Sequence, residues 1–308
     1  MSKMLFPPGL KPGDTIGIVA PSAPCETEIA PAIAELEAAG YRLCPGHSVH
    51  NADGFLAGDD KSRAADLAEM FLREDIKAIL CLRGGYGAAR ILPLLPFAQI
   101  RKNPKLFIGY SDITALHIAL QEKAGLATVH GPMLTSLLPS RRPTAYTRAA
   151  LLRGLSEPFR KGRFPQAKGH KLSALAAGKA RGRLAGGNLT VLASLIGTPY
   201  ELKGDGCLLF LEDVGEAAYR IDRMLNQLTQ SGLIRRVSGI ILGDFTRCGP
   251  TQPEPYDFSV NEVLTVYAGR WQKPLISGLS AGHGRQNGWL PLGGEAEIDT
   301  DTNTLTFI

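Results

Sequence analysis

The first half of the chain repeats one unit, a short apolar run followed by a segment with the apolar spacing of a helix. Asp14–Pro21 has the composition of a buried strand, and the helical segment behind it ends at Gly40. The strand pattern recurs at Tyr41–Cys44, Ile76–Leu82 and Ala127–Val129, and in the apolar run that stops at Gly109. Strands that alternate with helices in this way form a parallel, doubly wound sheet, so the predicted fold class is α/β.

Three loops of the first half are predicted to lie together, because the carboxyl ends of parallel strands share one edge of a sheet. They are Pro21–Pro24, Arg83–Gly87 and Gly109–Asp112. Gly85–Arg90 begins like a dinucleotide-binding fingerprint but ends in arginine where a small residue is required. The chain also lacks a Gly-x-x-x-x-Gly-Lys-Ser/Thr motif, so the sequence does not support nucleotide binding.

Ser111 stands where an apolar run ends and the next helical pattern begins. A strand–turn–helix of this kind exposes a serine hydroxyl above the sheet edge, as in a nucleophile elbow, although Ile113 occupies the position of the last glycine in Gly-x-Ser-x-Gly. A backbone N–H of the glycine-rich loop and that of Asp112 would then form an oxyanion hole. Two simpler interpretations stay open: a helix N-cap for Ser111, and a purely geometric role for the glycines.

Length and composition predict two domains with no membrane or nucleic-acid partner. The 308 residues carry a net charge of +5 that forms no basic tail, and no apolar run has the length of a membrane span or a signal peptide. Five scattered cysteines without a Cys-x-x-Cys pair fit a reducing cytoplasm. A polar, basic stretch, Glu157–Gly178, is predicted to link an N-terminal α/β domain (1–160) to a C-terminal α/β domain (175–308).

The second half also mixes strands and helices. Strands are predicted at Gly206–Leu211 and Val237–Leu242, and helices from Gly186 to about Ile196 and over Tyr219–Leu228. The alternating segment Leu290–Ile308 predicts a closing β-meander.

A serine nucleophile needs a base, and the base needs a group that orients it. Among six histidines, His283 lies in a run of small residues typical of a tight exposed loop, whereas His130 follows an apolar strand and is a second candidate. His117 lies six residues into the helix after Ser111 and is predicted to be structural. Glu212 ends a buried strand, where a carboxylate is desolvated and fixed. The residues alone allow a Ser111–His283–Glu212 triad, and they equally allow Glu212 to be a paired structural ion.

Four stretches carry more information when they are taken together: Arg83–Arg90, Ile108–Leu116, Phe210–Leu225 and Gly282–Gly293. In this order they resemble the LD-carboxypeptidases (muramoyltetrapeptide carboxypeptidases), the serine peptidases of family S66, and the likeness extends over nearly the whole chain. The resemblance implies a flavodoxin-like N-terminal domain and a smaller, β-rich C-terminal domain, assembled as a homodimer.

The resemblance also implies a reaction and a set of roles. Ser111 would be the nucleophile, His283 the general base and then general acid, and Glu212 the group that orients the imidazole. The backbone N–H groups of Gly85 and Asp112 would form the oxyanion hole. The enzyme would release the terminal D-Ala of a murein tetrapeptide, by cutting after the L-centre of meso-diaminopimelate, in cytoplasmic peptidoglycan recycling. It would need no metal and no other cofactor.

A multiply charged muropeptide requires cations or amide donors in the cleft. The sequence offers Arg83, Arg220 and Arg285 for the D-Ala carboxylate, Glu216 and Asn188 for diaminopimelate, and Tyr86 for the cleft wall. Structural roles remain an alternative for Glu216 and Asn188.

Two other functions are compatible with the sequence. The same family includes a microcin C immunity-type branch that cleaves peptidyl or aminoacyl adenylates. That branch requires an aromatic residue to stack on adenine, and Trp271 and Trp289 are the two tryptophans of the chain. The third hypothesis is a non-catalytic ligand-binding protein on the same scaffold.

Overall fold

The computed structural model describes residues 3–249 and 256–308, and the chain divides into two compact units. The first unit contains the chain up to Phe159 together with the short segment Trp289–Pro291. The second unit contains Arg160–Gly288 and Leu292–Ile308. None of the helices in the described ranges is both long enough and apolar enough to cross a bilayer.

A parallel sheet forms the centre of the first unit. Its strands are β1 (Thr15–Val19), β2 (Arg42–Pro45), β3 (Ile76–Cys81), β4 (Leu106–Gly109), β5 (Thr128–His130) and β12 (Leu290–Leu292). They lie in the order β12-β5-β4-β3-β1-β2, and the neighbours among β1 to β5 pair in parallel. The order 2-1-3-4-5 of the first five strands is that of flavodoxin-like folds, which confirms the predicted fold class.

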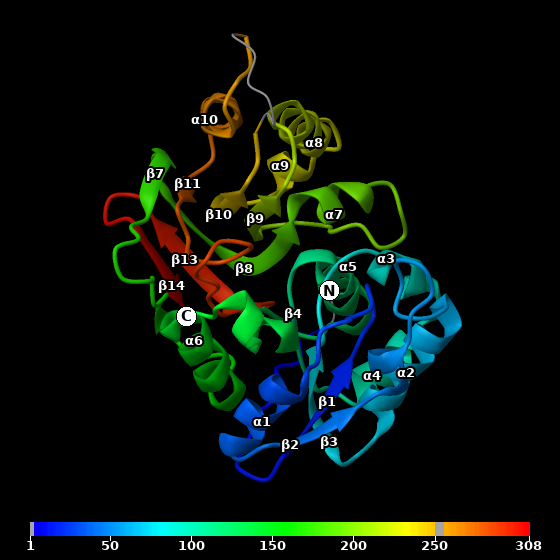
Figure 1. The fold of residues 1–308 in the computed structure, drawn as a ribbon. Helices are drawn as coiled ribbons and strands as arrows, with labels where there is room; N and C mark the ends of the chain where they lie inside the picture. Colours follow the sequence, from blue (N-terminus) through cyan, green and yellow to red (C-terminus); the bar gives the residue numbers. More distant parts are fainter. Residues whose placement is uncertain (1–2, 250–255) are drawn as a thin grey trace. The chain divides into compact units, whose positions relative to one another are not determined.

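Helices cover both faces of this sheet. They are α1 (Ala30–Ala38), α2 (Asp60–Leu72), α3 (Ala88–Ile91), α4 (Phe97–Lys102), α5 (Thr114–Ala119) and α6 (Ala145–Ser156). In Figure 1, α1 lies on one side of β1, and α2 and α4 lie on the other. Single turns of 3-10 or π helix occur at His47–His50, Leu92–Leu94, Ser111–Ile113, Leu120–Ala124, Leu134–Leu137 and Pro139–Arg141.

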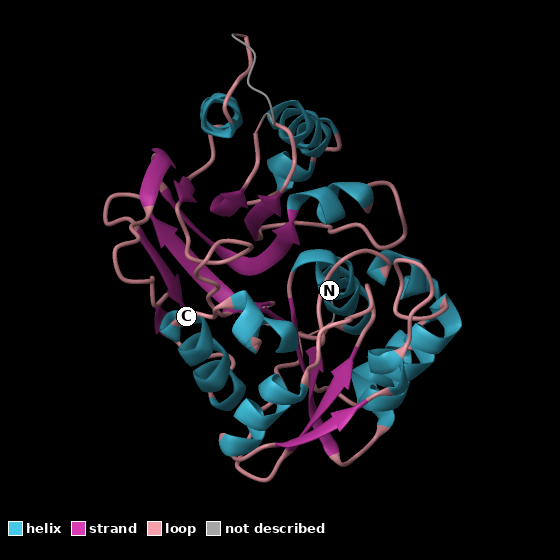
Figure 2. Cartoon of the chain, viewed as in Figure 1, coloured by secondary structure: helices cyan, strands magenta, loops and turns pink. Residues whose placement is uncertain are grey.

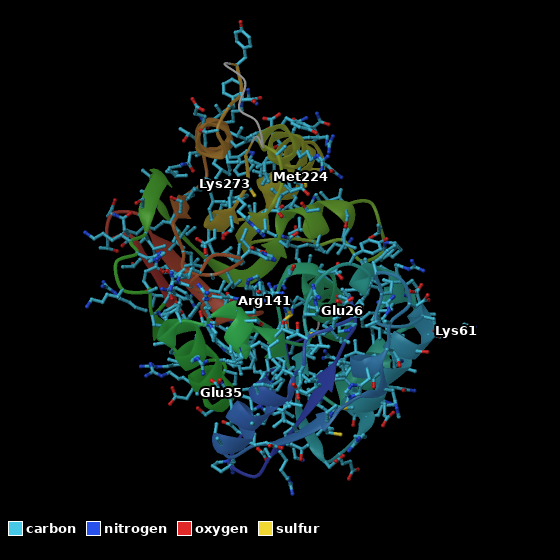
Figure 3. All side chains as sticks on the ribbon, viewed as in Figure 1. Glu26, Glu35, Lys61, Arg141, Met224 and Lys273 are labelled. Carbon is cyan, nitrogen blue, oxygen red and sulfur yellow. The ribbon has the colours of Figure 1, made fainter. Side chains whose placement is uncertain are left out.

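Helix α2 shows how the sequence pattern produces these elements. Asp59 caps its N-terminus by accepting the Ser62 N–H at 2.8 Å, as expected for an aspartate before an amphipathic run. Leu67 and Phe71 are fully buried, and Lys61 points outward on the other face (Figure 3). Phe71 stacks on Phe107 of β4 with ring centroids 6.0 Å apart, which fixes the helix on the sheet.

The second unit contains a mixed sheet of eight strands in the order β6-β14-β13-β8-β9-β10-β11-β7. The strands are β6 (Gly162–Arg163), β7 (Ser173–Ala176), β8 (Lys179–Asn188), β9 (Leu208–Val214), β10 (Gly239–Thr246), β11 (Leu275–Ser277), β13 (Glu295–Asp299) and β14 (Thr304–Phe307). β8 to β11 are parallel to one another, and the outer strands pair antiparallel. The helices of this unit, cyan like all helices in Figure 2, are α7 (Leu189–Ser194), α8 (Ala218–Gln230), α9 (Leu233–Arg236) and α10 (Val260–Trp271).

The segment Glu157–Gly178, predicted as a linker, contributes two strands of this sheet. β6 and β7 occupy its opposite edges, and most of their residues are exposed. β6 has two residues and β7 four, so both are too short to show a periodic pattern that would distinguish them from a loop.

The predicted β-meander at Leu290–Ile308 is also corrected. β13 and β14 form an antiparallel hairpin, but β12 lies at the edge of the first sheet, beside β5. The predicted helix at Gly186 begins three residues later, since Gly186–Asn188 is the end of β8 and Asn188 caps α7.

Candidate active site

Ser111 lies at a sharp corner between β4 and α5. Its φ is 67°, a left-handed conformation that a non-glycine residue adopts at a cost of about 1–3 kcal/mol. Neither the turn Ser111–Ile113 nor α5 has a side-chain cap, so the N-cap interpretation is wrong. The backbone of Gly84 packs against this serine, because a Cβ built at Gly84 would lie 2.8 Å from the Ser111 Cβ and 2.9 Å from its Oγ. A glycine is therefore required beside the serine.

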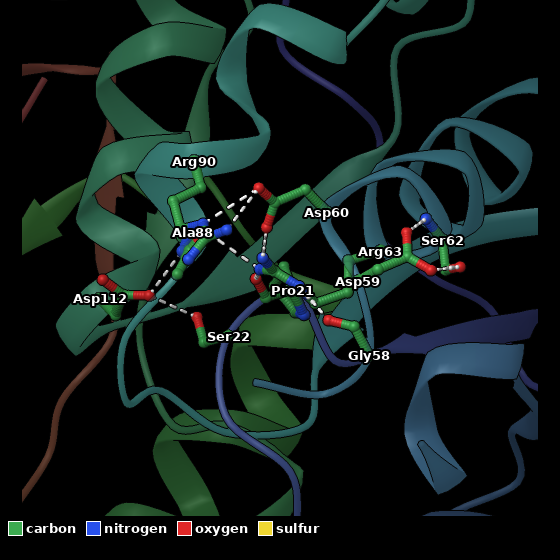
Figure 4. Close-up of polar contacts among 11 residues, drawn as sticks. Pro21, Ser22, Gly58, Asp59, Asp60, Ser62, Arg63, Ala88, Arg90 and Asp112 are labelled. Carbon is green, nitrogen blue, oxygen red and sulfur yellow. Dashed lines mark hydrogen bonds and ion pairs between the residues drawn. The ribbon is translucent and has the colours of Figure 1, made fainter. Parts of the chain in front are cut away.

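The carboxylate of Asp112 joins three loops. Its Oδ2 accepts the Ser22 hydroxyl at 2.6 Å and the Ala88 N–H at 2.8 Å (Figure 4). Burial raises the pKa of the Asp112 carboxyl, and the hydrogen bonds from Ser22 and Ala88 oppose that rise. The loop after β1, the glycine-rich loop and the serine turn therefore meet, as the sequence predicts.

Arg63 of α2, which was not among the predicted site residues, connects two of these loops, the one after β1 and the glycine-rich loop, to the loop before α2. Its side chain is buried, and its guanidinium donates to the carbonyls of Pro21, Gly58 and Gly87 and pairs with Asp60 (Figure 4). Its spacing of four residues from Leu67 would have placed it on the buried face of the helix.

The glycine-rich loop has a backbone that only glycine adopts readily. Gly85 has a φ of +132° and Gly87 one of +121°. The Arg83 side chain donates to the Pro24 carbonyl at 3.0 Å, so one of its N–H groups has a structural partner. Tyr86 is half exposed and meets Phe55 edge to face, with ring centroids 5.6 Å apart.

In the second unit, Glu212 and His283 form a hydrogen-bonded pair. Glu212 lies in β9 and is fully buried, and its Oε2 is 2.6 Å from His283 Nδ1 and 3.2 Å from the His283 backbone N–H donor. A carboxylate on Nδ1 fixes the ring proton there, so Nε2 is the nitrogen that can accept a proton. Gly282, with a φ of +117°, is needed because a Cβ there would lie 2.7 Å from Glu212 Oε2.

The remaining histidines of interest are buried in the first unit. His117 Nε2 lies 2.9 Å from the Gly109 carbonyl and Nδ1 lies 2.9 Å from Thr128 Oγ1, which confirms its structural role. Burial lowers its pKa from 6.5 to about 4, so the ring is neutral. His130, the second candidate for the cleft, is fully buried in β5 and its ring contacts that of Tyr110.

The residues predicted to contact the substrate in the second unit differ in their hydrogen-bond partners within the protein and in their exposure. Asn188 is buried, donates to Asp213 at 2.9 Å and accepts the Val191 N–H at 3.1 Å, an arrangement that favours its structural role. Glu216 accepts a bond of 3.5 Å from Arg220. Arg285 is exposed, two residues after His283. Among the residues that the structure describes, no group of three or more His, Cys, Asp or Glu side chains could hold a metal ion.

Comparisons with known proteins bear on both units. A sequence model of the LD-carboxypeptidase N-terminal domain (peptidase S66) matches residues 16–131, and one of the LD-carboxypeptidase C-terminal domain matches residues 181–298. A probable murein peptide carboxypeptidase of Bacillus subtilis is 39% identical over 98% of this chain and 93% of its own length.

Two solved structures are similar along almost their whole length. A muramoyltetrapeptide carboxypeptidase from Oxalobacter formigenes superposes with a TM-score of 0.81 and 30% identity, over 95% of this chain and 97% of that one. MccF in complex with glutamyl sulfamoyl guanosine superposes with a TM-score of 0.86 and 27% identity, over 98% of both chains.

The fold and the matched domains define the chain as an enzyme, a serine carboxypeptidase. The chain belongs to the LD-carboxypeptidase family, peptidase family S66.

Proposed function

We propose that the enzyme releases the terminal D-Ala of a murein tetrapeptide, by cleaving the bond between the L-centre of meso-diaminopimelate and D-Ala. The observation that carries the proposal is the pair of a buried carboxylate and an imidazole, Glu212 and His283, in a chain whose other matched domain holds Ser111 at a strained corner. Murein peptides are the substrates named for the similar carboxypeptidases. The residues themselves support acyl transfer to a serine.

In the proposed reaction, His283 Nε2 takes the Ser111 proton while Oγ attacks the carbonyl carbon of diaminopimelate. The N–H groups of Gly85 and Asp112 stabilise the oxyanion, and Glu212 holds the imidazolium. The C–N bond breaks as His283 gives the proton to the nitrogen of D-Ala. Water, deprotonated by His283, then attacks the acyl ester, and the proton returns to Ser111 Oγ.

The proposal extends to the organisation of the enzyme. Domain 1–160 would supply the nucleophile, and domain 175–308 the acid and the base. The remaining candidates for contacts with the substrate are Arg83, Tyr86, Asn188, Glu216, Arg220 and Arg285. We further propose a homodimer that works in the cytoplasm in peptidoglycan recycling.

The second candidate is cleavage of aminoacyl or peptidyl adenylates, which the similarity to MccF supports. The environment of the tryptophans disfavours it. Trp271 and Trp289 are each 8% exposed, and their indole N–H groups donate to Thr229 Oγ1 at 2.8 Å and to the Pro158 carbonyl at 3.0 Å. Both rings are therefore committed to packing, so neither presents a face for adenine.

The test is release of D-Ala from the tetrapeptide L-Ala-D-Glu-meso-diaminopimelate-D-Ala, followed by mass spectrometry. Ser111→Ala, Glu212→Gln and His283→Gln should each lower turnover by about 10³-fold or more, because a triad acts as a unit. Ser156→Ala, which changes an exposed serine of α6, should keep turnover within about twofold.

The outcomes separate the three functions. Near-wild-type turnover of the tetrapeptide by Ser111→Ala would refute the proposed mechanism. Faster hydrolysis of an aminoacyl sulfamoyl adenosine than of the tetrapeptide would favour the second candidate. Binding of the tetrapeptide by calorimetry, without release of D-Ala, would favour a non-catalytic protein.

A further inference from the structure

The loop that carries His283 runs beside the end of β10. The Leu279 N–H donates to the Leu242 carbonyl at 3.1 Å, and the Asp244 N–H donates to the Ala281 carbonyl at 3.2 Å. β9 and β10 are neighbouring parallel strands, with an irregularity in their pairing between Leu242 and Phe245. Asp244 lies within this irregular stretch, so its side chain can face the loop.

Asp244 meets the residue that follows His283. Its carboxylate accepts the Gly284 N–H, and a Cβ built at Gly284 would overlap the Asp244 carboxyl group. Only a glycine fits this contact. Glu212 makes the equivalent contact one residue earlier, because it accepts both the backbone N–H and the ring Nδ1 of His283. Two carboxylates from adjacent strands therefore hold two consecutive residues of the loop.

We infer that Asp244 is a positioning residue for His283: its carboxylate fixes the Ala281–Gly284 turn through the Gly284 N–H and places a second negative charge near the imidazole. A charge-assisted bond to a carboxylate is stronger than one to a neutral carboxyl group, so the turn is held most firmly when Asp244 is ionised. Its role in catalysis rests on the proposed function, in which His283 is the base.

The titratable groups that face Asp244 come from three elements. They are Glu212 in β9, His283 in the loop itself and His170 in the segment before β7. Burial, together with the charge of Glu212, raises the pKa of the Asp244 carboxyl to about 6, against the two histidines and the Gly284 N–H, which lower it. The carboxylate is therefore charged at neutral pH and becomes protonated between about pH 7 and 5.

The contact can be tested without any activity. In the full chain labelled with ¹⁵N-glycine, the Gly284 amide is assigned from the resonance that disappears in Gly284→Ala. We expect the chemical shift of this resonance to change with pH, with a midpoint near pH 6. Asp244→Asn keeps an acceptor oxygen but cannot ionise, so it should abolish this pH dependence. Glu297→Gln removes the same charge from an exposed position of β13 and should leave the transition unchanged. A wild-type Gly284 amide that does not titrate between pH 5 and 7 would overturn the inference, whether or not any variant folds.

The effect on catalysis is tested with the tetrapeptide assay. Asp244→Asn should lower kcat about tenfold at pH 7 and leave KM within about twofold, because Asp244 acts through His283 and not on the substrate. It should also remove the step near pH 6 in the pH dependence of kcat, whereas Glu297→Gln should change neither. An unchanged kcat and pH profile in Asp244→Asn refutes the positioning role. Retained activity in Ser111→Ala refutes the proposed function instead, and the glycine titration still decides the contact.

Discussion

His117 should make the first unit sensitive to acid. Its ring is fully buried, and a neutral imidazole satisfies both of its partners, with Nε2 donating to the Gly109 carbonyl and Nδ1 facing Thr128 Oγ1. A protonated ring would carry a buried charge with no carboxylate among these partners. Because the Gly109 carbonyl lies two residues before Ser111, the same bond also fixes the start of the serine turn.

The magnitude follows from the pKa of His117, which is 6.5 in the unfolded chain and about 4 in the folded protein. The folded value is the lower one, so the unfolded chain binds more protons between these pH values, and stability falls as the pH falls through 6.5 toward 4. The free energy of unfolding of the first unit should therefore drop by about 3 kcal/mol between pH 7 and pH 4 through this residue alone, at about 1.4 kcal/mol for each pKa unit.

The measurement is urea unfolding at several pH values. Trp289 belongs to the first unit and Trp271 to the second, so tryptophan fluorescence in a Trp271→Phe background reports the first unit. His117→Gln should be less stable than wild type at pH 7 but should lose about 3 kcal/mol less on acidification. His50→Gln, at an exposed histidine of the same unit, should keep the wild-type pH dependence. An equal loss of stability on acidification in wild type and His117→Gln would refute the reasoning, since every other titrating group is common to both.

Two further substitutions test the support of the serine. Arg63→Met should destabilise the first unit by about 3–5 kcal/mol in the same urea assay, because three buried carbonyls lose their donor. The control is Arg90→Met, at a more exposed arginine that also pairs with Asp60, and it should cost less than about 1 kcal/mol. Equal costs for the two variants would contradict the role of Arg63. Gly84→Ala should lower tetrapeptide turnover by about tenfold or more, since the added methyl group would displace Ser111. The control is Gly269→Ala in α10, where no other atom lies within 4 Å of the added methyl group. Full activity of Gly84→Ala would exclude the close contact between Gly84 and Ser111.

The elements with strong apolar periodicity could be predicted from the sequence. β1, β3 and α2 owe their form to local patterns, and the parallel arrangement of the strands follows from their alternation with helices. The order of the strands does not, because doubly wound sheets occur with more than one strand order. β8 was missed because most of its residues are charged or small. Gly182 in β8 approaches Gly206 so closely that a side chain would overlap the Gly206 carbonyl, so this strand depends on its neighbour for its conformation.

The residues of the candidate site also divide into those that a local sequence pattern locates and those that it does not. Ser111 follows an apolar run that ends a strand, so its position after that strand was predictable. Glu212 was predicted to end its strand, but β9 continues to Val214 and Glu212 lies within it. Arg63 and Asp244 were not found, because a charged residue in a sequence is expected to be solvated, whereas loops far away in the chain bury Arg63 and partly bury Asp244. The distance between His283 and Glu212 likewise depends on residues 71 positions apart, which no local pattern encodes.

The return of the chain to the first sheet at Trp289–Pro291 limits how this protein could be divided or recombined. A fragment that stops at Phe159 would leave the edge of β5 without β12 and would lose the indole that packs against Gly154. An unpaired strand edge beside an apolar surface that has lost its indole favours strand pairing between copies of the fragment. The N-terminal half is therefore not an interchangeable module: grafting a different C-terminal half onto it would require the donor to bring its own version of this short, distant stretch.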